Sequence, residues 1–139
     1  MGDVAGLVVS VVSPENILFE GEAEMVVCRP ADGEIAFLPG HEPFVGALGG
    51  FPVRVIRGAG QPEIAIAVHG GFVEFSEDRV TVLSDVAELP EQIDVVRAQT
   101  AKDEAERRLN DDPEDLVAIA ALTRANLRLE AAQGVTRAP

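Results

Sequence analysis

The C-terminal third of the chain carries arginines at spacings that suit the binding of an anion. Arg124 and Arg128 are four residues apart, and Asp94 and Arg97 are three apart, so each pair shares one face of a helix. Guanidinium groups offer forked donors that match phosphate or carboxylate oxygens. In the simpler interpretation, Asp94 and Arg97 form a solvent-exposed helix pair of little energetic weight.

Charge and composition limit the classes of partner. The net charge is −13, of which residues 1–89 hold −10 and residues 90–139 hold −3, so an anion is expected in the second part. This acidity argues against nucleic acid and anionic lipid, which need a cationic surface. No apolar run approaches the roughly 20 residues that span a bilayer, and residues 1–12 lack a signal peptide's basic start. We expect a soluble intracellular protein that meets a membrane only through a partner.

The histidines and the single cysteine do not form a reactive constellation. His41 and His69, with Glu42 or Glu74, could supply a cupin-like metal site, but such sites use closely spaced histidines and these lie far apart. His69 follows an apolar strand and is expected at a sheet edge with its hydrogen bonds satisfied. Cys28 is expected to be a small buried hydrophobe. We expect no metal, no catalytic residue and no enzymatic activity.

The chain up to about Ser84 reads as about ten short strands divided by turn residues. Many short strands at such spacing indicate an antiparallel β-sandwich or flattened barrel. Segment 64–68 alternates large and small apolar residues, as expected of a strand buried on both faces. The clearest strand segments are 7–12, 23–28, 35–38, 44–48, 52–56, 64–68, 72–75 and 80–83.

After the last strand the hydrophobic period changes from two to about 3.6, which predicts two helices. Pro90 suits the first turn of the first helix. Asp112 is predicted to cap the second helix, with Pro113 at its first position and Gly134 beyond its end. So short a turn makes an antiparallel hairpin. Its apolar stripes are rich in alanine, which buries little area, so we expect weak packing against the sandwich.

A stiff loop follows segment 35–38. Pro39 and Pro43 bracket it, and proline neither varies its φ nor donates to a strand ladder. The loop holds His41, which is expected to be exposed, and we expect it to be a preformed contact edge. In the alternative interpretation His41 is hydrogen-bonded to its own backbone.

The sequence resembles the epsilon subunit of F-type ATP synthase over nearly its whole length. The blocks that carry the likeness are residues 33–43 with their Pro-Gly-His turn, residues 66–75 followed by 80–88, and residues 93–98, Ile-Asp-Val-Val-Arg-Ala. The resemblance implies an α+β protein. Its N-terminal antiparallel β-sandwich would span residues 1–87, and its C-terminal antiparallel two-helix hairpin would span residues 88–139.

The resemblance implies a non-catalytic rotor subunit. In the family the sandwich binds the gamma subunit and rests on the c-ring, which ties proton-driven rotation to the central stalk. Glu34, Ala36 and His41 match the family's contact edge, although the family usually has Gly in place of Ala36. Glu34 could pair with an arginine of a c-subunit loop. A peripheral location at the cytoplasmic face of the bacterial inner membrane is also implied.

The resemblance further implies a regulatory hairpin. Some bacterial members bind ATP on the folded hairpin, although none requires a cofactor, and Arg97, Arg124 and Arg128 would then surround the triphosphate. The extended hairpin of the family enters the alpha/beta catalytic head and inhibits hydrolysis. The alternative is a stand-alone nucleotide sensor, which would not co-purify with gamma. The positions that match the family's ATP contacts are Glu88, Ile93, Asp94, Arg97, Ala98, Arg124 and Arg128.

Overall fold

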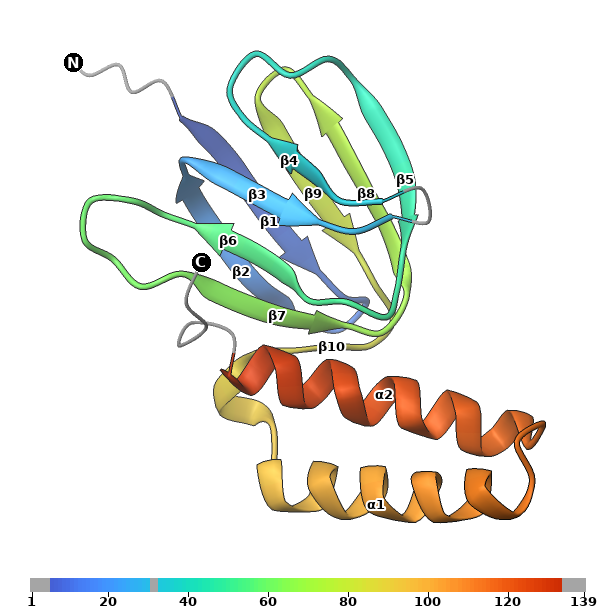
Figure 1. Ribbon diagram of the computed structural model, residues 1–139. Coiled ribbons are helices and arrows are strands. Elements are labelled where there is room, and N and C mark those ends of the chain that lie inside the picture. The colour runs from blue at the N-terminus through green and yellow to red at the C-terminus, as the bar shows by residue number, and fades with distance from the viewer. Residues whose placement is uncertain (1–5, 31–32, 134–139) are drawn as a thin grey trace.

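The computed structural model describes residues 6–30 and 33–133, which form a β-sandwich followed by a helical hairpin (Figure 1). The first sheet has the strand order β2-β1-β9-β8-β5, and the second has the order β10-β7-β6-β3-β4. The described strand pairs are antiparallel except β1 with β9, which are parallel. The predicted sandwich is therefore confirmed, with one parallel pair. The strands are β1 (Leu7–Val12), β2 (Ile17–Ala23), β3 (Met25–Cys28), β4 (Ile35–Phe37), β5 (Phe44–Leu48), β6 (Val53–Ile56), β7 (Ile64–Val68), β8 (Gly71–Ser76), β9 (Arg79–Leu83) and β10 (Ala87–Glu88).

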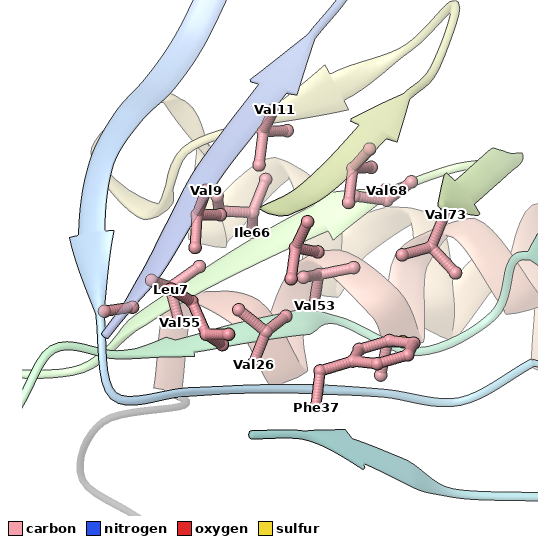
Figure 2. Packing of buried hydrophobic residues seen from close by; sticks show 14 of the residues in the cluster. Leu7, Val9, Val11, Val26, Phe37, Val53, Val55, Ile66, Val68 and Val73 are labelled. Atoms are coloured by element: carbon pink, nitrogen blue, oxygen red, sulfur yellow. The ribbon is translucent and has the colours of Figure 1, made fainter. Parts of the chain in front are cut away.

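Alternating residues of both sheets fill the space between them, as Figure 2 shows. In β1, Leu7, Val9 and Val11 are fully buried, while the residues between them face outward. Phe37 of the second sheet and Phe75 of the first stack with their ring centroids 5.2 Å apart. Burying a side chain of this size contributes about 1.5–3 kcal/mol. The sandwich thus has a hydrophobic core of its own.

Strand β7 is buried on both faces, as its alternation of large and small residues predicts. Ile66 and Val68 point into the sandwich core, where Figure 2 places them. Ala65 and Ala67 point the other way and are also fully buried. They form a second cluster with Ile93, Leu127 and Ala131. The hairpin therefore packs on a strip of alanines, which allows close approach but buries little area.

The hairpin has the predicted antiparallel form, but its second helix begins at Leu116 and not at Pro113. It comprises the 3-10 turn η1 (Pro90–Gln92), α1 (Val95–Asp111) and α2 (Leu116–Gln133). Helix α2 lies against β7, and α1 packs on the far side of α2 (Figure 1). Pro90 opens η1 rather than α1, Pro113 lies in the connecting turn, and Gly134 lies outside the described residues. Neither described helix is long and apolar enough to cross a bilayer.

The helix caps differ from the prediction. Asp94 precedes α1, and its Oδ1 accepts the N–H of Arg97 at 3.0 Å, so Asp94 is a cap and does not share a helix face with Arg97. Asp115, not Asp112, caps α2, because its Oδ1 accepts the N–H of Ala118 at 3.1 Å. The Asp112 carboxylate bonds within the turn instead, too early in the chain to reach α2.

Candidate functional site

The loop between β4 and β5 is a rigid turn held from more than one side. The N–H of His41 donates to the carbonyl oxygen of Leu38 at 3.0 Å, which closes a proline–glycine β-turn. Gly40 has a φ of 91°, in the left-handed region that glycine enters without strain. Its N–H donates to Oδ1 of Asp78, in the turn between β8 and β9, at 2.7 Å. The loop is therefore preformed, as its prolines predict.

His41 is half-buried rather than exposed, so that expectation is wrong. Its ring packs edge-on against Phe37 and Phe75, with centroid distances of 4.9 and 5.3 Å. Its Nδ1 lies 2.7 Å from the carbonyl oxygen of Glu42, and a carbonyl only accepts, so Nδ1 carries the hydrogen and donates. The alternative interpretation, a histidine bonded to its own loop, is confirmed. His41 holds the loop in shape from its inner side.

The other two residues of the predicted contact edge are exposed. Ala36 lies in the edge strand β4, opposite Val27 of β3. Glu34 comes just before β4 and lies near Arg54. The pKa of Arg54 is raised, chiefly because Arg54 donates a hydrogen bond to Glu63, and the negative charge of Glu34 contributes to the same rise. The Glu34 carboxylate therefore lies at one end of the edge strand β4, and the loop that holds His41 follows the other end.

Glu88 is the centre of the polar contact between the sandwich and the hairpin. Its Oε1 accepts from Nε of Arg128 and from Nε2 of His69, each at 2.8 Å. Burial opposes the charge on Glu88, but the two hydrogen bonds together outweigh it and lower the pKa of Glu88. The side chain of His69 is thus satisfied, as expected, but His69 follows β7, which is not an edge strand because β10 pairs with it. Through Glu88, His69 is linked to Arg128 of the hairpin. These residues are too far apart in sequence for a local pattern to reveal the link.

The other five positions that match the family's ATP contacts have different surroundings. Ile93 is buried against β7, and Ala98 is buried on the face of α1 that packs on α2. The Asp94 carboxylate caps α1. Arg97 and Arg124 are exposed. Among the described residues, the bond between Glu88 and Arg128 is thus the only recorded hydrogen bond that joins two side chains of the seven, because the bonds between Asp94 and residues 97 and 98 involve backbone N–H groups.

Helical geometry places the three arginines on one flank of the hairpin. A groove of about 620 Å³ runs along the other flank, and Gln99 of α1 and Asn126 of α2 line it. Arg97 is two residues from Gln99, and Arg124 and Arg128 are each two residues from Asn126, which is roughly 200° around a helix. All three arginines therefore face away from the groove.

A row of apolar side chains crosses the outer face of the first sheet. Strand register aligns Ala47, Phe72, Leu83, Val12 and Ile17, one from each strand, and we call this set the outer row. Phe72, Leu83 and Ile17 are 58%, 52% and 62% exposed. Single exposed hydrophobic residues are ordinary, but a contiguous row marks an interaction surface.

The outer row borders a groove of about 480 Å³, which Val12, Phe72 and Leu83 line together with Val86 and His69. Sequence reasoning missed this surface. The signal was present in β8, where Phe72 and Phe75 have opposite orientations, so both faces of that strand carry aromatic residues. Alternation alone does not reveal which apolar set faces the core.

The described residues offer little reactive chemistry. Within residues 6–30 and 33–133, no three His, Cys, Asp or Glu side chains are grouped so that they could hold a metal ion. Cys28 is buried, as predicted, and burial raises the pKa of its thiol to about 12. A thiol in that state is a packing residue.

Family models match the chain along most of its length. The β-sandwich domain of the ATP synthase delta/epsilon chain matches residues 7–90, and the long α-helix domain of the same chain matches residues 91–133. The chain belongs to the ATP synthase delta/epsilon family. The resemblance drawn from the sequence is confirmed.

Curated relatives of the family cover nearly all of the chain. An ATP synthase epsilon chain of Shouchella clausii is 40% identical over 131 residues, which are 94% of this chain and 97% of that one. That of Thermobifida fusca is 43% identical over 129 residues, 91% and 92% of the two chains. That of Brevibacillus brevis is 47% identical over 105 residues, 76% and 79% of the two chains.

Chains of two solved ATP synthase structures share the fold. A chain of the Euglena gracilis mitochondrial ATP synthase, in an assembly of OSCP, F1 and c-ring, superposes with a TM-score of 0.75 at 23% identity, covering 95% of this chain and 84% of that one. A chain of the Tetrahymena thermophila mitochondrial ATP synthase central stalk and c-ring gives a TM-score of 0.52 at 9% identity, covering 94% and 96%. At such identities the likeness concerns the fold alone.

Proposed function

We propose that this chain is a rotor subunit of a proton-translocating F-type ATP synthase, in which it couples the turning c-ring to the central stalk and performs no catalysis itself. The observation that carries the proposal is the outer row, a continuous apolar surface on a small acidic sandwich. Relatives named ATP synthase epsilon chain support it. The proposal includes the division of the chain into a sandwich domain, residues 1–87, and a hairpin domain, residues 88–139. Strand β10 crosses the boundary between the two.

The outer row is the proposed docking surface for the gamma subunit. It runs across the five paired strands of the first sheet, and three of its side chains are more than half exposed. Covering each of these half-exposed side chains contributes about 1 kcal/mol. The groove beside the row gives a partner side chain a place to insert, which is how a few residues come to dominate an interface.

The second proposed contact, with the c-ring, is the sheet edge made by Glu34, Ala36 and the loop that holds His41. Its loop is fixed before any partner arrives, so little conformational entropy is lost on docking. The Glu34 carboxylate is exposed and suits a cationic partner loop. Held in this way, the chain lies at the cytoplasmic face of the bacterial inner membrane and is peripheral to it.

The docking proposal is tested by the change Leu83→Asp, which places a charge in the outer row. In a pull-down with purified gamma subunit, we expect at least about a tenfold loss of affinity. Val96→Asp is the matched control, because Val96 is 77% exposed but lies on α1, and it should bind gamma as the wild type does. Equal affinity of Leu83→Asp and wild type would overturn the proposal. Binding to ATP but never to gamma would favour the stand-alone nucleotide sensor.

We further propose that ATP is a regulatory ligand of the folded hairpin. Arg97 and Arg124 are exposed on the flank that also carries Arg128, and their guanidinium groups match the triphosphate oxygens. Because Glu88 already engages Arg128, bound ATP has to share or displace that contact. If ATP binds the folded hairpin more tightly than the extended one, it opposes insertion of the hairpin into the alpha/beta head by that difference in binding free energy.

The nucleotide proposal is tested by calorimetric titration of the full chain with ATP. Arg124→Ala should weaken binding about tenfold, because a charge-assisted bond is lost. Lys102→Ala is the control, since Lys102 lines the groove on the opposite flank, and it should leave the affinity within about twofold. Equal weakening by both variants would point to unspecific attraction of the anion.

A further inference from the structure

The turn between β8 and β9 has a backbone that few residues adopt. Glu77 and Asp78 have φ angles of 51° and 60°, and Ser76 pairs with Arg79 across them, which makes a two-residue hairpin of the type that matches strand twist. Asp and Asn tolerate the left-handed region better than most residues, whereas Glu does not share this advantage. The position of Asp78 therefore suits its residue type.

Asp78 also ties together two other parts of the sandwich. Its carboxylate Oδ1 accepts the N–H of Gly40 at 2.7 Å, across 38 residues of sequence. Its backbone carbonyl oxygen accepts the N–H of Val8, in β1, at 3.0 Å. The bond to Gly40 reaches the centre of the proline–glycine turn, and an ionised acceptor makes it stronger than a neutral one. The loop is thus held by His41 on its inner side and by Asp78 from the neighbouring sheet.

We infer that Asp78 is a positioning residue for the c-ring contact: it fixes the loop between β4 and β5 relative to the first sheet. This inference rests on the proposed function, because the loop is the proposed contact edge. Asp78 need not touch the ring. A contact that transmits rotation must resist bending, and the Asp78 bond links the loop to the sheet that carries the outer row.

The inference is tested with three variants of the full chain. Asp78→Gly keeps the left-handed backbone without strain but removes the acceptor. Asp78→Asn keeps both the backbone preference and an acceptor oxygen. Glu77→Gly changes the neighbouring residue of the same turn and controls for added flexibility, since Glu77 is exposed and the structure records no side-chain bond for it among the described residues.

The first readout is hydrogen exchange of the Gly40 amide in each isolated chain, measured by NMR. We expect exchange about tenfold faster in Asp78→Gly, as for loss of a bond to a charged group, and within about threefold of wild type in Asp78→Asn and Glu77→Gly. The second readout is the affinity of each chain, in complex with gamma, for purified c-ring. We expect about a fivefold loss for Asp78→Gly alone.

The outcomes separate this inference from the proposed function. An unchanged Gly40 amide in Asp78→Gly overturns the inference whatever the ring does. Faster exchange with unchanged ring affinity also overturns it, provided that Glu34→Lys weakens ring binding in the same assay. If Glu34→Lys also leaves ring binding unchanged, the proposed contact edge is itself wrong.

Discussion

At the scale of single residues, the backbone of Gly71 passes unusually close to that of Leu83, where β8 begins. A Cβ on Gly71 would lie 2.1 Å from the carbonyl oxygen of Leu83, and the φ of Gly71 is 129°. Backbone atoms cannot yield as a flexible side chain does. The glycine is therefore required by space as well as by conformation.

We predict that Gly71→Ala lowers the free energy of unfolding by about 3 kcal/mol or more, through strain and displacement of β9. Thermal and urea unfolding would measure the loss. Gly49→Ala is the matched control, because a Cβ there meets nothing within 4 Å, and it should change stability by about 0.5 kcal/mol or less. Similar losses in both variants would contradict the close approach.

The charge of Glu88 makes docking of the hairpin sensitive to acid. The pKa of Glu88 is lowered in the folded chain, so its contribution is complete above the ordinary value of 4.5 and is lost as the pH falls through the lowered pKa. Glu88 and Arg128 are partly exposed, so the contribution is about 0.5–1 kcal/mol.

We predict that acidification below about pH 4.5 shifts the methyl signals of Ala65 and Ala67, which report contact with α2, toward their undocked positions. Glu88→Gln should show part of this shift at neutral pH and lack the acid-dependent step. Glu91→Gln, an exposed neighbour in η1, should titrate like the wild type. A wild-type step that persists in Glu88→Gln would assign the acid sensitivity to another group.

At the scale of elements, α2 depends on a cap that the sequence leaves ambiguous. Asp115 accepts the N–H of Ala118, and this hydrogen bond lowers the pKa of Asp115, with a further contribution from Arg108, whose Nη2 lies 2.8 Å from Oδ2. Four of the five residues 111–115 are acidic, and any of several could cap a helix that starts nearby. The capping residue is decided by where α2 begins, which is at Leu116, directly after Asp115.

We predict that Asp115→Ala speeds amide exchange in the first turn of α2 about fivefold, as expected for loss of an N-cap. Asp112→Ala should have a smaller effect on the same amides, because the one hydrogen bond recorded for the Asp112 side chain among the described residues is to the N–H of Glu114, within the turn. The reverse order of effects would restore Asp112 as the cap.

Local patterns predicted most of the elements but few of the contacts between them. The alternation in 64–68 correctly predicted a strand covered on both faces. The edge strand β2 was not recognised, because Glu20, Gly21 and Glu22 interrupt its apolar pattern. The hydrogen bonds that Glu88 accepts from His69 and Asp78 accepts from Gly40 join segments far apart in sequence, and the periodicity of one segment does not encode such pairs.

At the scale of the whole molecule, the chain offers two separate surfaces: the outer row on the face of the first sheet, and the edge that holds Glu34. If the proposed contacts hold, rotation reaches the stalk only when both surfaces are engaged at once. The loop, the Asp78 bond and the first sheet form a continuous connection between them. A defect at either surface should therefore uncouple the enzyme without unfolding the chain.

We predict that Glu34→Lys lowers proton-driven ATP synthesis to roughly half or less in reconstituted ATP synthase, because it reverses a rim charge at the ring. The isolated variant should keep its unfolding temperature. Glu104→Lys makes the same charge change on an exposed position of α1, away from both proposed surfaces, and should leave synthesis unchanged. An unaltered coupling ratio in Glu34→Lys would defeat the proposed edge.

The alanine strip on β7 affects the solubility of the sandwich when the hairpin is undocked. If α2 undocks, the surface of β7 that becomes exposed consists of Ala65 and Ala67, whose side chains are methyl groups. A bare sheet of leucine or phenylalanine would invite other chains to adhere, whereas methyl groups give water little to expel. The core of the sandwich stays buried behind these alanines. The sandwich can therefore remain monomeric in solution while the hairpin is undocked.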